Sequence, residues 1–279
     1  MMKTNSEVKD CFLRENQAKF SKGTVRIYKS IINEFFRICN KGYSEISRAD
    51  IRAWNAALNN KGQETSTIRL KLCCIKSLFK YLIDEDLVKI NPIKGIKLPK
   101  RNDSIPRYLN KKELAKLTEQ VKKSIQMRMV VELLYVTGVR ISELLNMQKG
   151  DIKWDSRQIW IRKGKGNKER FVLFTPECAE RLKVYLNTNS NDTPYIFPNR
   201  SGKPLRPKWA QKFFRDCSSN LGFKVTPHML RHTFAVHLAE KGMPQTYLQE
   251  LLGHDDINST KIYTKLYNEA RKQKYDSYQ

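Results

Sequence analysis

The chain has 279 residues, of which 53 are lysine or arginine and 28 are aspartate or glutamate, so its net charge is +25 at neutral pH. This length suits one large domain or two smaller ones, and with 40% hydrophobic and 10% aromatic residues a core can form, which argues against general disorder. The sequence has no apolar run of membrane-spanning length and no signal-peptide core at its N-terminus, so we expect a cytoplasmic protein without membrane contact. The six cysteines lack metal-ligand spacing, so we expect reduced thiols, without zinc or disulfides.

The excess positive charge indicates a polyanionic partner. Residues 1–98 carry 19 basic and 10 acidic side chains, and residues 99–279 carry 34 and 18. Both parts are therefore basic, unlike a neutral enzyme with a basic tail. Nucleic acid is the partner that this pattern favours, because lysine and arginine side chains at phosphates release counterions and raise affinity.

The first hundred residues are predicted to be helical. Apolar residues recur every three or four positions from Thr24 to Cys39 and from Thr65 to Leu82. Between these two helices, Ser47 followed by Asp50 predicts the N-terminal cap of another helix.

Residues 91–106 are predicted to form an extended basic linker. This segment contains three prolines, one glycine and four basic residues, a composition that favours an exposed connection. We therefore place one domain at residues 1–98 and another at residues 107–279.

The second predicted domain is helical with one small sheet. Asn110 and Glu113 predict the cap of its first helix. Residues 158–174 contain two strand-like runs around a segment rich in glycine and lysine, which predicts a β-hairpin. The helices are expected at residues 110–121, 125–137, 176–187, 207–220, 227–241 and 244–252.

Two motifs whose residues could take part in catalysis or phosphate binding lie in the first half of this domain. In TGVRISELL, a glycine suited to a helix end precedes Arg140, and Glu143 lies three positions later, where the two side chains can pair. At the tip of the hairpin, Lys163, Lys165 and Lys168 lie on a turn that could reach a phosphodiester. Taken alone, the first motif does not decide between a site and an ordinary surface ion pair, and the lysine segment alone favours a solvated turn.

Two further motifs lie near the C-terminus. In TPHMLRHTF, a cap and a first-turn proline begin a helix on which His228 and Arg231 share one face near the positive end of the helix dipole. In ELLGH, His254 is followed nine residues later by Tyr263. On composition alone, Tyr267 is as good a candidate for a functional tyrosine as Tyr263.

Together these signals resemble the tyrosine recombinase family, also called the phage integrase family, and in particular its Xer-type members. The segments TGVRISELL, GKGNKERF, TPHMLRHTF, ELLGH and IYT occur in family order within residues 137–264. The resemblance implies a mostly α fold of two domains: a helical, SAM-like core-binding domain and an α-rich catalytic domain with a small β-sheet. In the family these form a clamp around double-stranded DNA.

The resemblance also implies a reaction. Tyr263 would attack a DNA phosphodiester and form a 3′-phosphotyrosyl intermediate, and exchange would then proceed through a Holliday junction. Tyrosine is a weak nucleophile with a pKa of about 10, so the charge that builds up on the phosphate must be stabilised. Arg140 and Arg231 would hold this charge, because a guanidinium group is always protonated and offers a planar fork of donors.

The remaining assignments follow from the same resemblance. His228 would accept the proton of the tyrosine, and His254 would donate to a non-bridging oxygen. Lys165, which lies between the two glycines of the hairpin, would protonate the departing 5′-oxygen, with its neighbouring lysines as rivals. Glu143 would orient the cluster, and neither metal nor nucleotide cofactor is expected.

Partners and alternatives are implied as well. The C-terminal segment 264–279 would dock on a neighbouring protomer, so that four chains assemble on two DNA recombination sites; an accessory or paired recombinase is left open. Because helical sequence begins by about residue 10, no arm-binding domain is expected, which favours simple Xer-like sites. The alternatives are a type IB topoisomerase and a catalytically silent DNA-binding protein on this fold. Resolution of chromosome or plasmid dimers and integration or excision of a mobile element would use the same catalytic core.

Overall fold

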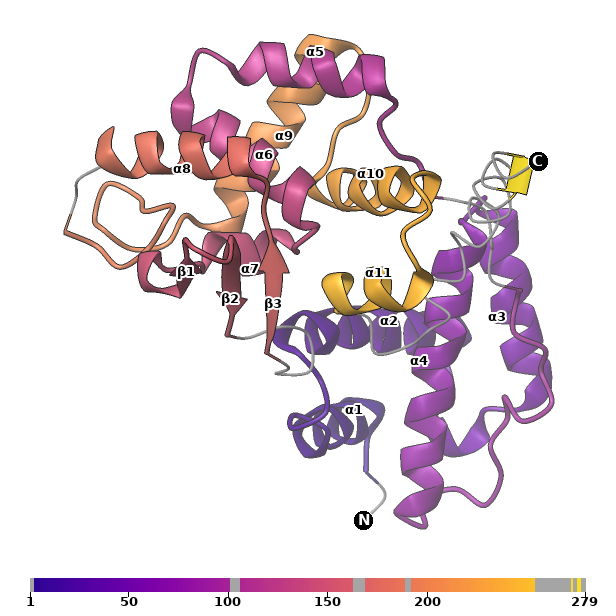
Figure 1. The fold of residues 1–279 in the computed structure, drawn as a ribbon. Helices are drawn as coiled ribbons and strands as arrows, with labels where there is room; N and C mark the ends of the chain where they lie inside the picture. Colours follow the sequence, from indigo (N-terminus) through magenta and orange to yellow (C-terminus); the bar gives the residue numbers. More distant parts are fainter. Residues whose placement is uncertain are drawn as a thin grey trace. The chain divides into compact units, whose positions relative to one another are not determined.

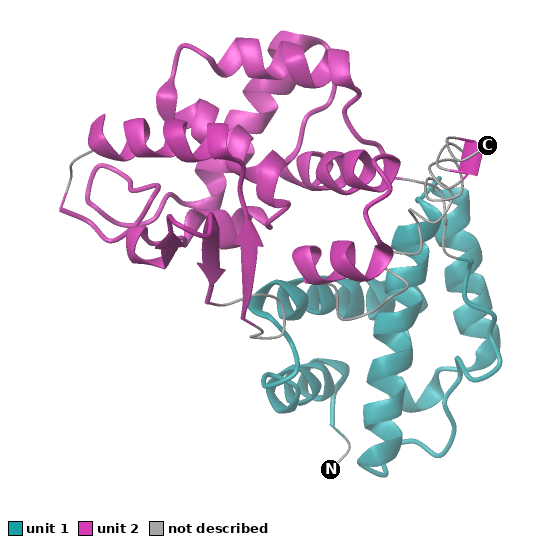
Figure 2. Ribbon diagram, in the orientation of Figure 1, with its two compact units in different colours: residues 1–103 teal, residues 104–279 magenta. Residues whose placement is uncertain are grey.

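The computed structural model describes residues 3–100, 106–162, 169–188, 192–253, 272 and 275–276. The chain divides into two compact units, residues 1–103 and residues 104–279, which Figure 2 shows in different colours. Within the described residues, no helix combines the length and the apolar character that a membrane crossing requires.

The N-terminal unit is built from helices (Figure 1). Its α-helices are α1 (Asn5–Glu15), α2 (Lys22–Cys39), α3 (Arg48–Asn60) and α4 (Thr65–Asp84). The helices predicted from Thr24, from Ser47 and from Thr65 are confirmed. The Ser47 hydroxyl accepts a hydrogen bond from the backbone N–H of Asp50, as the sequence predicts.

Aromatic residues fill the core of this unit. Phe35 of α2 packs edge-on against Trp54 of α3, with ring centroids 4.9 Å apart, and against Phe79 of α4. Ile93, from the segment expected to be a linker, is also buried in this core. Residues 91–98 thus contain side chains that pack with the N-terminal unit.

The C-terminal unit is helical with one small sheet, so the predicted fold class, mostly α with a small β-sheet, is confirmed. The predicted helices are present within a few residues of their expected bounds. Its described elements are α5 (Lys111–Val121), α6 (Ile125–Thr137), α7 (Ile141–Leu145), β1 (Ile152–Lys153), β2 (Gln158–Ile161), β3 (Arg170–Leu173), α8 (Pro176–Thr188), α9 (Pro207–Leu221), α10 (Pro227–Glu240) and α11 (Gln245–Leu252).

The sheet is antiparallel in the order β1-β2-β3. The predicted hairpin is confirmed in β2 and β3, where Ile159 pairs with Val172 and the rings of Trp160 and Phe171 lie 4.3 Å apart. The two-residue β1 was not predicted, since so short a strand has no periodicity to detect.

Helix α6 is central to the C-terminal unit, because it packs against α5, α7, α8, α10 and β3. At its end, Gly138 adopts a left-handed conformation with φ of 62° and closes the helix by donating to the carbonyl of Leu134. A Cβ atom at Gly138 would lie 2.3 Å from Cδ1 of Phe234 in α10. The position therefore requires glycine both for its backbone conformation and for the close approach of α10.

We predict that Gly138→Ala lowers the free energy of unfolding by about 3 kcal/mol, because backbone strain adds to a clash with a buried ring. Gly222→Ala is the matched control: its φ is 73°, but nothing lies within 4 Å of the added Cβ. The control should lose only about 1 kcal/mol. Urea unfolding of both variants checks the difference, and equal losses would contradict the role of Phe234.

Candidate active site

Arg140 is fixed by the turn between α6 and α7. It is the N-cap residue of α7, and Glu143 in the first turn of that helix binds it twice. Glu143 Oε2 accepts a hydrogen bond from the backbone N–H of Arg140 at 2.8 Å, and Oε1 accepts one from Nη1 at 2.8 Å. The predicted pairing of these two residues is therefore present, and it orients both the backbone and the side chain of Arg140.

Arg231 lies in the first half of α10, which begins as predicted: Thr226 caps the helix and Pro227 occupies its first turn. The arginine is only 6% exposed. Its Nη1 donates to the carbonyl of Gly138 and its Nη2 to the carbonyl of Leu252, both at 2.6 Å. Arg231 thus links the end of α6 to the end of α11.

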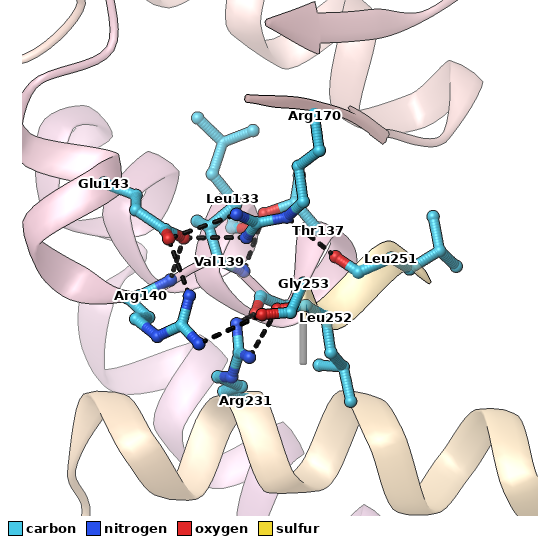
Figure 3. A network of polar contacts seen from close by, with 11 residues as sticks. Leu133, Thr137, Val139, Arg140, Glu143, Arg170, Arg231, Leu251, Leu252 and Gly253 are labelled. Atoms are coloured by element: carbon cyan, nitrogen blue, oxygen red, sulfur yellow. Dashed lines mark hydrogen bonds and ion pairs between the residues drawn. The ribbon is translucent and has the colours of Figure 1, made fainter. Parts of the chain in front are cut away.

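The two arginines meet at the end of α11 (Figure 3). Arg140 Nη2 donates to the carbonyl of Gly253 at 3.3 Å, next to the carbonyl of Leu252 that binds Arg231. Gly253 ends the helix in a left-handed conformation with φ of 60°. Three motifs that are separate in the sequence, around Arg140, Arg231 and Gly253, therefore meet at one place.

A third arginine, Arg170 at the start of β3, belongs to the same cluster and was not predicted as a site residue. Its Nη1 and Nη2 donate to the two carboxylate oxygens of Glu143 at 3.1 and 2.8 Å, and its Nε donates to the carbonyl of Leu251 at 3.2 Å. The sequence contains one signal for it. Arg170 lies two positions from the buried Val172, and alternate residues of a strand share a face.

Glu143 is the anion at the centre of the arginine cluster. Its side chain is 3% exposed. Burial would raise the pKa of its carboxyl group, but the hydrogen bonds and charge of Arg170, together with those of Arg140, outweigh burial and hold that pKa below its usual value. Glu143 is therefore ionised at neutral pH and fixes two guanidinium groups at once.

His228 lies in the first turn of α10, one turn before Arg231. Partial desolvation, followed by the positive charges of Arg231 and Arg140, lowers the pKa of its imidazole. The neutral ring, which can accept a proton, is therefore the dominant form at neutral pH.

The other predicted site residues lie outside the described residues. These are Lys165, His254 and Tyr263, together with the rivals Lys163, Lys168 and Tyr267. Elsewhere, within the described ranges, no group of three or more histidine, cysteine or carboxylate side chains could hold a metal ion.

Comparison with known proteins identifies the family. The model of the phage integrase family matches residues 107–270, and the model of the phage integrase N-terminal SAM-like domain matches residues 11–89. The chain belongs to the phage integrase family.

Two curated relatives of this integrase-family chain are tyrosine recombinases. Tyrosine recombinase XerC of Bacillus licheniformis is 32% identical over 280 residues, which cover 94% of this chain and 92% of the relative. Tyrosine recombinase XerA of Pyrococcus furiosus is 35% identical over 252 residues, which cover 88% and 84%. The chain is therefore an Xer-like tyrosine recombinase that cleaves and rejoins DNA by site-specific recombination. The topoisomerase and the silent DNA-binding protein are not favoured.

Solved structures show the same fold. A lambda integrase tetramer bound to a Holliday junction matches with a TM-score of 0.74 and 20% identity, covering 91% of this chain and 78% of the other. The SAM-like character expected for the N-terminal domain of this recombinase is confirmed by the family match.

His232 gives the catalytic unit a testable pH dependence. Burial, followed by the charges of His228 and Arg231, lowers the pKa of His232 to about 4. A histidine with a lowered pKa binds a proton more readily in the unfolded state, so its contribution to stability is complete above about pH 6.5 and is lost as the pH falls towards the folded value.

We predict that lowering the pH from about 7.5 to 5 lowers the unfolding free energy of the wild type by about 2 kcal/mol more than that of His232→Gln, which cannot titrate. Urea unfolding of the full chain at the two pH values measures this difference. Equal losses in both proteins would show that His232 does not take up a proton on unfolding in this range.

Proposed function

We propose that this recombinase exchanges DNA strands through a 3′-phosphotyrosyl intermediate formed on Tyr263. The tyrosine oxygen attacks the scissile phosphorus, the bond to the 5′-oxygen breaks, and the 5′-hydroxyl leaves. The 5′-hydroxyl of a partner strand then attacks the phosphotyrosyl bond and releases the tyrosine. Because one phosphodiester is exchanged for a phosphotyrosyl ester of similar energy, the cycle requires no external energy source.

The observation that carries this proposal is the meeting of Arg140 and Arg231 at the end of α11. Both guanidinium groups are held by fixed oxygen acceptors, so their charges are in place before a phosphate arrives. Fixed donors of this kind stabilise a pentavalent phosphorane more than its ground state, since the negative charge increases during attack. Removal of one such donor costs about 100- to 1,000-fold in rate.

Proton transfer completes the proposed mechanism. His228 accepts the proton of the tyrosine, which its lowered pKa supports, because a neutral imidazole is required. Lys165 protonates the departing 5′-oxygen, His254 donates to a non-bridging oxygen, and Glu143 orients Arg140. The reaction uses neither metal nor nucleotide cofactor in this scheme.

We propose double-stranded DNA at a recombination site as the substrate, with the two units forming a clamp around it. The net charge of +25 supports this. Self-association into a tetramer on two sites is supported by the tetrameric lambda integrase bound to a Holliday junction, which has the same fold. The Xer names of the relatives fit chromosome partition and cell division, so we propose resolution of chromosome or plasmid dimers in the cytoplasm, with integration or excision of a mobile element as the alternative.

We predict that Tyr263→Phe abolishes the covalent DNA adduct and leaves DNA affinity nearly unchanged, because only one hydroxyl is removed while many phosphate contacts remain. The wild type and the variant are incubated with a suicide DNA substrate and resolved on a denaturing gel, with binding measured in parallel. Tyr267→Phe is the matched control and should form adduct at the wild-type rate. An adduct on the Tyr263→Phe variant would identify another nucleophile.

We also predict that deletion of residues 266–279 preserves cleavage of a single site but abolishes recombination between two sites. This short segment is too small to form a stable helix alone, so we propose that it is stabilised by docking on a neighbouring protomer. Cleavage and recombination are assayed separately on the full chain and the truncated chain. Recombination at the full rate after truncation would show that docking in trans is not required.

A further inference from the structure

We propose that Arg170 is a positioning residue for DNA cleavage, which holds Arg140 in the geometry that receives the phosphate. The inference rests on the proposed function, in which Arg140 stabilises charge on the scissile phosphate. Arg170 acts through two contacts, one to Glu143 and the other to the end of α11.

The first contact fixes the carboxylate that orients Arg140. Arg170 binds both oxygens of Glu143, so this carboxylate can rotate only by breaking two charged hydrogen bonds. The side chains of Arg170 and Glu143 are 12% and 3% exposed, so water has little access to replace either bond. Since Glu143 binds both the backbone and the side chain of Arg140, its orientation is passed on to that arginine.

The second contact places Arg170 against the glycine that Arg140 also binds. Arg170 Nε donates to Leu251, and a Cβ atom on Gly253 would lie 3.0 Å from Cδ, Nε and Nη1 of Arg170. The carbonyl of the same glycine accepts from Nη2 of Arg140. Arg170 therefore contacts both residues that accept hydrogen bonds from the Arg140 side chain: Glu143 through its carboxylate, and Gly253 at the end of α11.

Arg170 also connects this cluster to the hairpin. It is the first residue of β3 and pairs with Ile161, the last residue of β2. The segment between these strands contains Lys165, the proposed donor to the leaving group. One side chain thus ties the base of the lysine-bearing segment to the arginine that stabilises the phosphorane.

A second arginine–glutamate ion pair of the same unit provides a control that distinguishes positioning of Arg140 from general stabilisation of the fold. Arg181 of α8 is paired with Glu132 of α6, and neither residue belongs to the arginine cluster. The Nε of Arg181 donates to the two carboxylate oxygens of Glu132 at 2.9 and 2.8 Å. Arg181→Ala therefore removes a paired arginine from the same unit without touching Glu143 or α11. It controls for a loss of stability that has no effect on positioning.

The test compares two DNA substrates that differ only at the scissile phosphate. One is a phosphodiester and the other a methylphosphonate, which is neutral before attack, so the non-bridging atoms carry one negative charge fewer both before attack and in the phosphorane. On the phosphodiester, Arg170→Ala should slow adduct formation by about 10- to 100-fold at saturating DNA, with DNA affinity unchanged. On the methylphosphonate, the same variant should lose less than about threefold, because charge placement by Arg140 matters less there.

Two further variants keep the test decisive. Arg170→Lys retains the positive charge but not the planar guanidinium group that binds both oxygens of Glu143. Its rate of adduct formation on the phosphodiester should therefore fall by about tenfold. Because one of the two contacts of Arg170 is to Glu143, a double variant with Glu143→Gln should lose less rate than the product of the two single losses. Arg181→Ala should cleave both substrates at the wild-type rate.

Each outcome has one meaning. Equal losses of Arg170→Ala on both substrates, or additive losses in the double variant, would overturn the positioning role. Should Arg170→Ala not fold, the same two comparisons on Arg170→Lys decide the question. If the wild type formed adduct on neither substrate, the proposed function itself would be overturned. That outcome differs from the ones that would overturn only the positioning role of Arg170.

Discussion

The active-site architecture depends on the buried carboxylate of Glu143, because this one anion sets the positions of two guanidinium groups. A carboxylate that is 3% exposed would be strongly destabilising without partners. Here each oxygen is paired, and the donors come from the N-terminal turn of α7 and from β3. The cost of burial is offset only while all of these elements keep their places, so the ion pair makes the site rigid as well as charged.

The end of α11 supplies the complementary acceptors. The last carbonyls of a helix lack partners within it and carry the negative end of the helix dipole. In this protein three successive carbonyls, of Leu251, Leu252 and Gly253, accept from Arg170, Arg231 and Arg140 respectively. The Leu-Gly-His motif thus has a structural role besides its histidine: its backbone holds the arginines where they meet.

The parts of this structure that depend on local physics could be predicted from the sequence. Apolar periodicity predicts the helices, and the caps at Ser47, Asn110 and Thr226 form as expected.

The meeting of Arg140 with Arg231 followed from the family resemblance and not from periodicity, since no local rule relates residues 91 positions apart. Arg170 was missed because an arginine that follows a lysine-rich segment is expected to be exposed to solvent. Its side chain becomes buried only because α11 packs against β3. Ile93 was assigned to a linker because prolines and lysines dominate its neighbourhood, although it packs in the N-terminal core.

The charge of the arginine cluster links two steps of the proposed reaction. Three guanidinium groups and one carboxylate leave these four side chains with a net charge of +2. A phosphodiester carries one negative charge and the phosphorane formed by attack carries more, so this field favours the transition state over the bound substrate. Burial lowers the pKa of the His228 imidazole, and the charges of Arg231 and Arg140 lower it further, so the ring is neutral at neutral pH. The guanidinium groups that would stabilise the charge of the phosphorane therefore also add to the effect of burial on His228, the proposed acceptor of the tyrosine proton, because they keep their charge at neutral pH.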